Sequence, residues 1–482
     1  MPNLTHNENN TSQEVFPNYR KPLLTITFLF FMWGFITVMN DVLIPHLKAV
    51  FELSYFQAAL IQFAFFGAFF IVSLLYFIVS VSKGDPISKI GYKNGIIIGL
   101  LLCGLGCCLF YPATLIQRYG IFLTALFVLA SGVTILQIAA NPYAAILGKP
   151  ETASSRLNLA QGFNSFGATL APLVGAILLY KVFSNGEITV DSLKIPYLIY
   201  GGLFFLLALV IKFIKLPSFK NTEQLEKGLY VLKYQHVVLG MVAIFVYVGG
   251  EVTIGSFLIN FFKLESIAGM EEAQGGVFLS YYWGGAMIGR FLGSVAMGSM
   301  TDKVKKYVVM AGLSVISFLV IYFITGVQNN EGTFSLELIP FAQVQFFVFF
   351  LVLNYIAFLI GGSNPSRVLT LFATIVIVLL GVMIFTNGMV AFWSAIAIGA
   401  FNSILWSNIF TLAIKDLGKY TSQASSLLVM MIVGGAIVPI VQGGLADQIG
   451  IQQSFIIPVF CYAYLIFYGV KGHRVVPIKS NS

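Results

Sequence analysis

Residues 24–43 read LTITFLFFMWGFITVMNDVL, an apolar run of twenty residues that contains one acidic side chain. A helix of about 20 apolar residues crosses the hydrocarbon core of a bilayer, which is about 30 Å thick. Similar runs recur along the whole 482-residue chain. The predicted spans, fourteen in all, cover residues 24–43, 56–80, 94–113, 120–140, 159–180, 197–216, 236–262, 275–299, 307–326, 341–361, 368–386, 389–412, 425–444 and 452–470.

The composition supports a membrane protein of the all-α class. Hydrophobic residues make up 58% of the chain and charged residues 10%, whereas soluble domains carry about 25% charged residues. The net charge of +8 does not indicate nucleic acid binding, because the basic residues are scattered over short loops. The sequence has no GxxxxGK[ST] loop for ATP, no HExxH pair and no close histidines for a metal site. We therefore expect no enzyme activity and no cofactor.

The distribution of Lys and Arg predicts the topology. An even number of spans puts both termini on one side, and with the N-terminus inside, 22 of the 27 basic residues fall on the inner side. The five others are Lys48, Arg118, Lys181, Lys194 and Lys263. Inner loops of membrane proteins carry this excess of positive charge. We therefore expect both termini in the cytoplasm.

A basic loop divides the chain into two groups of spans. The predicted organisation is a tail at 1–22, a six-helix bundle at 23–216, a cytoplasmic linker at 217–235, a second bundle at 236–472 and a tail at 473–482. The segments GATLAPLVGAIL around Pro172 and GGAIVPIVQGGL around Pro439 are similar, and each opens an outward-running span. Duplicated halves joined by a linker are typical of secondary transporters.

Two acidic residues lie within predicted spans, where a charge is costly and usually functional. Asp41 shares a helix face with Trp33, Thr37 and Asn40, although an aspartate in the outer part of a span can also sit at the membrane interface. Glu251 lies mid-span, where it can bind a proton, ligate Na⁺ or contact a substrate; the structural alternative is a hydrogen bond to a neighbouring helix. Arg290 is expected nearer the cytoplasmic end of its span, where it can reach the interface.

Amide and indole side chains recur within the spans. Amides bond sugar hydroxyls and indoles stack on the apolar face of a pyranose, although amides also join membrane helices to one another. Gln137 and Asn141 share one face of the fourth span, and Asn158, Gln161 and Ser165 share one face of the fifth. The residues that we expect to bind a sugar are Trp33, Asn40, Asp41, Gln137, Asn141, Gln161, Asn164, Asn402 and Trp406.

Several long strings resemble the fucose/glucose/galactose–cation symporters, a branch of the major facilitator superfamily. They are WGFITVMNDVLIPHLKAVF at 33–51, LSYFQAALIQFAFFGAFFI at 53–71, QIAANPYAAILG at 137–148, RLNLAQGFNSFGA at 156–168 and IVGGAIVPIVQGGLAD at 432–447. The resemblance covers nearly the whole chain. It implies two six-helix bundles around a central cavity and alternating access by rocking, in a bacterial inner membrane.

The resemblance also suggests roles for single residues. Asp41 matches the first-helix aspartate that proton-coupled fucose carriers use in substrate binding and protonation. Those carriers have a carboxylate where this chain has Gln137, and a glutamine where it has Glu251. This exchange of acid and amide is more like the glucose/galactose members, some of which use Na⁺. Gln161 and Asn164 match family positions that face the cavity.

The chain departs from the family in its number of spans. The family has twelve, and SRVLTLFATIVIVLLGVMIF at 366–385 resembles its ninth helix. We therefore expect an inserted helix pair at about 307–361, packed outside the cavity.

The sequence thus predicts a monomeric secondary transporter that moves a monosaccharide with Na⁺ or H⁺, with glucose or galactose as the first choice. Glu251, Asp41 or both would bind the coupling cation. Two alternatives stay open: a proton-coupled carrier of fucose or another sugar, and a membrane sensor or scaffold on the same fold that transports nothing.

Overall fold

Long α-helices make up nearly all of the protein in a computed structural model, which describes residues 19–51, 55–176, 193–217, 228–330 and 333–476. The side chains of residues 40–50, 55–59, 62, 273, 328–330, 333 and 334 lie outside the description. The elements of the N-terminal half are α1 (Arg20–Val50), α2 (Tyr55–Lys83), α3 (Pro86–Ile90), α4 (Tyr92–Ile116), α5 (Tyr119–Ile146), η1 (Pro150–Thr152), α6 (Ala153–Ala176) and α7 (Lys194–Phe213).

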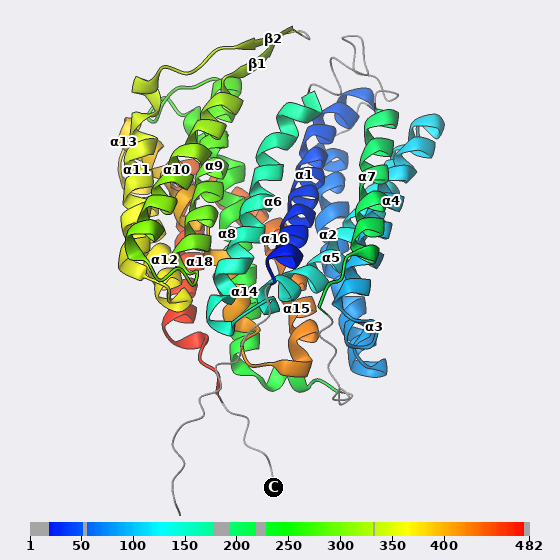
Figure 1. Cartoon of the computed structure of the whole chain (residues 1–482). Coiled ribbons are helices and arrows are strands. Elements are labelled where there is room, and N and C mark those ends of the chain that lie inside the picture. Colours follow the sequence, from blue (N-terminus) through cyan, green and yellow to red (C-terminus); the bar gives the residue numbers. More distant parts are fainter. Residues whose placement is uncertain (1–18, 52–54, 177–192, 218–227, 331–332, 477–482) are drawn as a thin grey trace, which may run out of the picture.

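The C-terminal half contains more helices, several of them short, and one pair of strands. Its elements are η4 (Tyr230–Lys233), α8 (Gln235–Phe262), α9 (Glu272–Ala296), α10 (Lys303–Thr325), β1 (Val327–Asn330), β2 (Thr333–Leu336), α11 (Phe341–Gly361), α12 (Pro365–Phe385), α13 (Gly388–Asn402), α14 (Leu405–Ala413), η5 (Gly418–Tyr420), α15 (Thr421–Met430), η6 (Met431–Val433), α16 (Gly434–Ile449), α17 (Ile451–Ser454), α18 (Ile456–Phe467) and η7 (Tyr468–Gly472). Figure 1 shows the long helices running side by side.

The prediction of a polytopic helical membrane protein is confirmed. In the described residues, 12 helices are long and apolar enough to cross a bilayer. Two more long helices, α6 and α9, overlap the spans predicted at 159–180 and 275–299. Both carry polar residues along the faces that meet the other half of the protein, which lowers their mean hydropathy.

Three of the predicted spans are interrupted helices. The span predicted at 389–412 is α13 followed by α14, with a break at Ser403 and Ile404. The span at 425–444 is α15, the short turn η6 and α16, and the span at 452–470 is α17, α18 and η7. Hydropathy does not detect such breaks, because the apolar run continues through them.

The two halves use the same packing pattern. In the N-terminal half α1 packs on α6, α4 on both α5 and α7, and α2 on α5. In the C-terminal half α8 packs on α16, α12 on both α13 and α18, and α9 on α13. The similar segments around Pro172 and Pro439 thus lie on α6 and α16, which occupy equivalent places beside α1 and α8. This arrangement is what duplicated halves predict.

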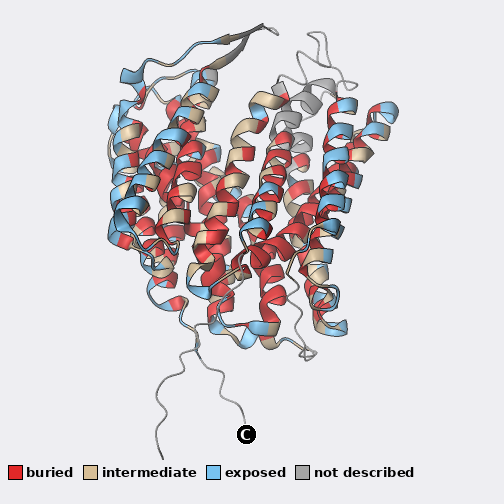
Figure 2. Cartoon of the chain, viewed as in Figure 1, coloured by how far each residue is buried: buried red, intermediate tan, exposed pale blue. Residues whose placement is uncertain are grey.

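The helices α10 and α11 lie outside this common pattern. Of the 23 residues of α10, only Met310, Ser317 and Ile321 are buried, and exposed residues cover the outer faces of both helices in Figure 2. The strands β1 and β2 form a hairpin between them, with Val327 opposite Leu336. The Tyr322 hydroxyl donates to the Ile339 carbonyl at 2.5 Å and ties the hairpin's exit to α10.

The domain boundaries remain predictions. They include the linker at 217–235, of which residues 218–227 lie outside the described residues.

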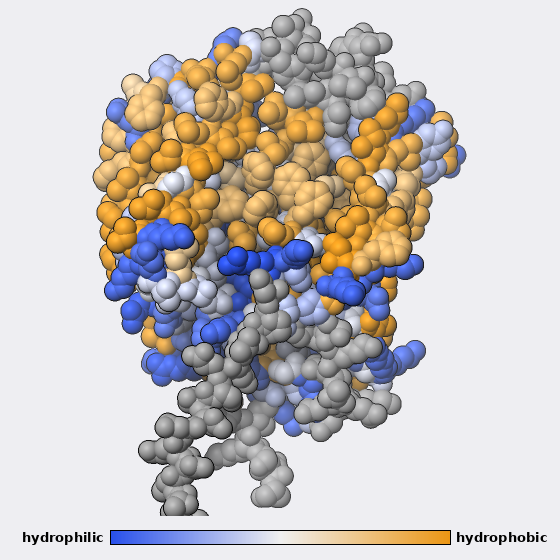
Figure 3. Space-filling view, viewed as in Figure 1, coloured by the Kyte–Doolittle hydropathy of each residue, from blue (hydrophilic) through white to orange (hydrophobic). Residues whose placement is uncertain are grey.

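The surface suits a bilayer. Large apolar side chains such as Phe213, Phe385 and Ile440 are exposed, and apolar residues cover most of the face shown in Figure 3. Hydrophilic residues gather toward one end, at the bottom of the view. That end carries α3 and the connections from α5 to α6, α9 to α10 and α14 to α15, and we call it the α3 end.

Close helix approach sets the position of α13 against α9. Gly285, Gly289 and Gly293 recur every four residues on α9, and a Cβ on Gly289 would lie 2.2 Å from the Ser403 hydroxyl. A Cβ on Gly399 of α13 would lie 1.9 Å from the Tyr282 carbonyl. Small residues at such crossings let the backbones of membrane helices touch.

We expect Gly399→Ala to lower the free energy of unfolding by about 1–3 kcal/mol, because α13 would have to move away from α9. The matched control is Gly381→Ala in α12, where an added Cβ meets no atom within 4 Å. There the substitution should stabilise the helix by about 0.5–1 kcal/mol. Thermal unfolding of the purified protein in detergent measures both, and equal effects at the two positions would contradict the close packing.

Candidate functional site

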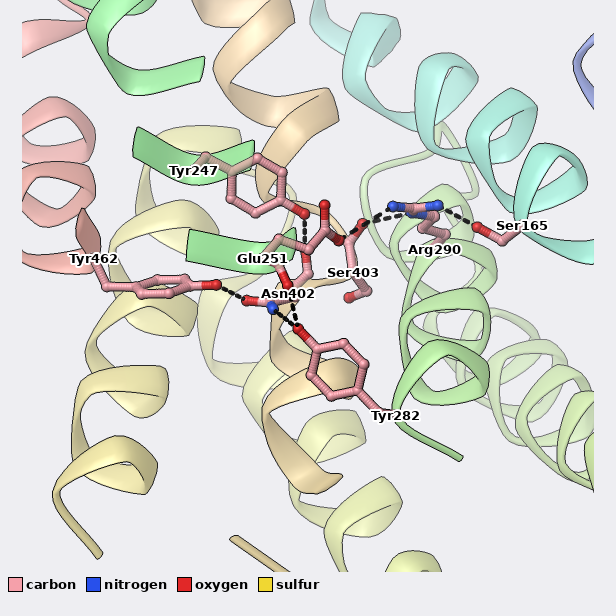
Figure 4. Close-up of polar contacts among 8 residues, drawn as sticks. All are labelled: Ser165, Tyr247, Glu251, Tyr282, Arg290, Asn402, Ser403 and Tyr462. Carbon is pink, nitrogen blue, oxygen red and sulfur yellow. Dashed lines mark hydrogen bonds and ion pairs between the residues drawn. The ribbon is translucent and has the colours of Figure 1, made fainter. Parts of the chain in front are cut away.

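The Glu251 carboxylate lies buried in α8, where the helix faces the interior of the protein. The residue is 8% exposed and stands one helical turn beyond Tyr247. Its Oε1 atom has no hydrogen-bond partner among the described residues. The nearest cationic atom is Nη2 of Arg290 on α9, 3.7 Å from Oε1 (Figure 4). The carboxylate is thus paired by charge and retains an open acceptor atom.

Arg290 contacts three elements from both halves of the protein. Its Nε donates to the Ser403 carbonyl in the break between α13 and α14 at 3.0 Å, and its Nη1 donates to the Ser165 hydroxyl on α6. With its side chain 14% exposed, Arg290 does not reach the membrane interface, so that prediction is wrong. The prediction relied on depth: Arg290 lies six residues before the end of α9 at Ala296, roughly 9 Å along the axis.

The ion pair of Glu251 and Arg290 contributes to the stability of the protein, whether or not it also has a part in function. Removing one partner of a buried ion pair leaves the other charge uncompensated, at a cost of about 3–5 kcal/mol. The break after Asn402 reduces this cost, because the Ser403 carbonyl just beyond the end of α13 points its negative dipole end at the guanidinium.

Asn402 is the centre of a network of tyrosines at the same break (Figure 4). Its side-chain nitrogen donates to the Tyr282 hydroxyl at 2.9 Å, and its side-chain oxygen accepts from Tyr462 at 2.5 Å. The Tyr247 hydroxyl donates to the Asn402 carbonyl at 2.9 Å, and Tyr282 donates to the Glu251 carbonyl at 3.2 Å. The network ties α8, α9, α13 and α18 together around Glu251.

Three of the predicted amides lie together in the N-terminal half. Gln161 of α6 donates to the side-chain oxygen of Asn141 on α5 at 3.4 Å, and the Asn141 nitrogen has no partner in the described part of the chain. Gln137 is buried one turn before Asn141 on the same helix. Ser165, the partner of Arg290, lies one turn beyond Gln161. Gln161, which bonds Asn141, thus lies one turn along α6 from the contact with Arg290.

The remaining predicted residues are dispersed. Trp33 is buried in α1 against Phe30, with ring centroids 4.8 Å apart, and Asn164 donates to the Phe30 carbonyl at 3.0 Å. Trp406 is half-buried on α14 and stacks on Phe410. The side chains of Asn40 and Asp41 lie outside the described residues.

At the α3 end the two halves are joined by direct hydrogen bonds. The Ser154 hydroxyl on α6 lies 2.6 Å from the Thr411 hydroxyl on α14, and Ser155 donates to the Ser294 carbonyl on α9 at 2.5 Å. The Ser425 hydroxyl of α15 donates to the Ile138 carbonyl of α5 at 3.0 Å. These contacts close the α3 end.

Sequence patterns do not single out one residue of this closed end, Asp85. This buried residue precedes α3 and accepts from the hydroxyls of Tyr76 at 2.5 Å and Ser80 at 3.1 Å, and from the backbone N–H of Ser88 at 2.7 Å. Across the interface it accepts from the Ser422 hydroxyl on α15 at 2.6 Å. An acidic residue beside a glycine in a short loop is an ordinary sequence feature, so its role as a bond between the halves emerges only from the fold.

The described residues contain no group of three or more His, Cys, Asp or Glu side chains that could hold a metal ion. Two grooves of about 400 Å³ lie elsewhere, one lined by Arg367 and Thr370 of α12 and one by Leu24 of α1 and Leu203 of α7. Neither includes Glu251, Arg290 or the amides. The buried polar cluster around Glu251, rather than these grooves, is therefore the candidate site.

Comparison with known proteins agrees with this architecture. Residues 23–369 match the family model described as Major Facilitator Superfamily. The chain is 42% identical over 98% of its length to a glucose/galactose transporter of Brucella abortus, with 98% of that protein covered, and 37% identical to a putative glucose/galactose transporter of Helicobacter pylori, with 93% of this chain and 96% of that protein covered. A crystal structure of a transporter of the same superfamily in the outward conformation superposes with a TM-score of 0.71 at 30% identity, covering 94% of this chain and 98% of that one.

We expect Asn402→Leu to lower the free energy of unfolding by about 2–4 kcal/mol, because the hydroxyls of Tyr282 and Tyr462 would both lose a buried partner. Tyr462→Phe should cost less, since it leaves only the Asn402 oxygen unpaired. Thermal unfolding in detergent compares the two variants, and Ile398→Leu on the same helix controls for altered apolar packing. A wild-type unfolding temperature for Asn402→Leu would exclude a structural role of the network.

Proposed function

The chain belongs to the Major Facilitator Superfamily, and on this premise we propose that it is a secondary transporter that carries a monosaccharide together with a cation. Glucose or galactose is the first choice of substrate, because full-length relatives in Brucella abortus and Helicobacter pylori bear that name. The observation that carries the proposal is the buried Glu251 carboxylate with its unpartnered oxygen. A protein that only spans the membrane has no need for this costly group.

Glu251 is the proposed site of the coupling cation. An open carboxylate oxygen in the protein interior can accept a proton, or it can ligate Na⁺ with nearby carbonyl and hydroxyl oxygens. Asp41 remains a second candidate. A relative in Escherichia coli is named as an L-fucose-proton symporter at 30% identity, which keeps H⁺ beside Na⁺ as the coupling ion and fucose as the alternative substrate.

The proposed sugar contacts are the amides of Gln137, Asn141 and Gln161, with Trp33 and Trp406 as apolar surfaces for a pyranose ring. The free nitrogen of Asn141 supports this role, since it has a donor to spare. Asn402 and Asn164 have protein partners for their amides. For these two we propose that they hold helices together instead.

The proposed mechanism is alternating access by rocking of the two halves. The excess of Lys and Arg supports the α3 end as the cytoplasmic side, and its closure by Ser154, Thr411 and Asp85 would then correspond to a carrier closed toward the cytoplasm. Reopening requires these interfacial bonds to break. Binding of sugar and cation together would lower that barrier. We propose a bacterial inner membrane location and a monomer, with no enzymatic step.

Uptake of labelled glucose and galactose by proteoliposomes tests the proposal. Accumulation driven by an imposed Na⁺ gradient identifies Na⁺ coupling, and accumulation driven by a pH gradient identifies H⁺ coupling. If neither sugar accumulates under either gradient, fucose and other monosaccharides are tested next. Absence of transport with all of them would favour a membrane sensor or scaffold.

We expect Glu251→Gln to abolish uphill accumulation, because an amide cannot bind a proton or supply a charged ligand, while sugar binding or exchange continues. Uptake under a gradient is compared with counterflow of labelled sugar in the same liposomes. The control is Glu337→Gln, which alters an exposed residue next to β2. Wild-type accumulation by Glu251→Gln would remove Glu251 from the coupling step.

We also expect an oxidised Ser154→Cys/Thr411→Cys double variant to lose at least about nine-tenths of its transport, since a disulfide would hold the α3 end closed. Reduction should restore the rate. Each single-cysteine variant controls for the native thiols, of which Cys103, Cys107 and Cys461 are buried. Unchanged transport after complete cross-linking would show that the α3 end need not open.

A further inference from the structure

We propose that Arg290 is a tethered cation that competes with the coupling ion for the Glu251 carboxylate, and that Ser165 transmits the result to the N-terminal half. The inference rests on the proposed symport and adds the element that would couple the ion to the movement of the two halves. Arg290 would act as a positioning residue, since it acts through Glu251 and Ser165.

The contacts of Arg290 differ in strength, and the weakest one is to Glu251. The bonds to the Ser403 carbonyl and the Ser165 hydroxyl have hydrogen-bond geometry. The approach to Glu251 Oε1, at 3.7 Å, is an ion pair without a hydrogen bond. The guanidinium thus neutralises the carboxylate and leaves its oxygen free for another cation.

A second cation bound at Glu251 changes the net charge around the Arg290 guanidinium. A proton removes the negative charge, and Na⁺ adds a positive charge beside the guanidinium. In both cases Arg290 is left with the neutral Ser403 carbonyl and Ser165 hydroxyl as hydrogen-bond partners. A buried charge without a counter-charge is unfavourable. Occupation of Glu251 by the ion therefore disfavours the present position of Arg290.

Through its hydrogen bond to Ser165, the position of Arg290 affects the N-terminal half of the protein. It lies on α6, the helix that also carries Ser154 and Ser155 at the closed α3 end. One turn away on the same helix is Gln161, one of the proposed sugar-binding amides. Displacement of Arg290 would release a contact between α9 and α6, the pair of helices that packs along the interface between the halves. The helix α6 thus carries the contact to Arg290, a proposed sugar-binding amide and the interfacial serines, and it would couple ion binding and sugar binding to the interface.

The ion dependence of sugar binding tests the proposal in the purified, full-length protein. Sugar affinity is measured by calorimetry across a series of Na⁺ concentrations and pH values. In the wild type, affinity should rise with the coupling ion. If it does not, and the gradients drive no uptake, the proposed function itself fails, whatever the variants do.

In Arg290→Gln, Glu251 loses its internal competitor and should bind the ion more tightly. The Na⁺ concentration that half-saturates the effect should fall at least about tenfold, or the midpoint pH should rise by about one unit. The other titratable groups around Glu251 are the phenols of Tyr247, Tyr282 and Tyr462, which the variant retains. Arg367→Gln, at an exposed position of α12, is the matched control. An unchanged midpoint in Arg290→Gln overturns the proposal.

Two further variants separate coupling from folding. If Arg290→Gln does not fold, the double variant Arg290→Gln/Glu251→Gln is used, because it removes both charges. The double variant should unfold at a higher temperature than either single variant, and a lower or equal unfolding temperature would contradict the pairing of the two charges.

Ser165→Ala should leave the ion midpoint within about twofold of wild type and change the transport rate several-fold. Ser131→Ala is its control, because among the described residues the Ser131 hydroxyl bonds within its own helix, to the Phe127 carbonyl. Equal rates for the two serine variants would overturn the role of Ser165.

Discussion

A charge in the hydrocarbon core has no solvent to stabilise it, and the interior of this protein is arranged around that constraint. Glu251 and Arg290 are buried in neighbouring helices, and each is tolerable because the other is present. The arrangement requires α13 to break where the guanidinium needs carbonyl oxygens. It also requires the glycines of α9, which let that break approach closely enough. The tyrosines around Asn402 then satisfy the backbone carbonyl and the side-chain amide of that residue at the break.

The two halves of the site differ in which of their buried polar groups have hydrogen-bond partners. In the C-terminal half Asn402 and the three tyrosines around it are paired with one another, while Glu251 keeps one open oxygen beside Arg290. In the N-terminal half Asn141 keeps a free nitrogen and Gln161 makes one long bond. This arrangement suits a carrier in which the C-terminal half binds the ion and the N-terminal half binds the sugar hydroxyls. Arg290 and Ser165 lie at the junction.

Much of the fold could be predicted from the sequence, because twenty-residue apolar runs have few solutions in a membrane. The buried position of Glu251 within a helix could be predicted as well, since a mid-span acid is conspicuous, and its role in coupling stays a proposal. Arg290 was misplaced because depth along a helix does not reveal where a long side chain points. Asn402 was identified as polar and important, but the sequence could not show that two tyrosines, from α9 and α18, already occupy its amide. The breaks in the last three spans and the role of Asp85 depend on contacts between distant segments, which hydropathy does not record.

The hairpin of β1 and β2 has a practical consequence. It lies at the end of the molecule opposite α3, and Tyr322 anchors the chain that leaves it. A transporter whose mass lies mostly within a detergent micelle offers few features for aligning single-particle images. A binding protein raised against this hairpin, or fused into it, would add a recognisable shape at a site away from Glu251 and Arg290. The hairpin between α10 and α11 thus supplies a natural attachment point for imaging the protein.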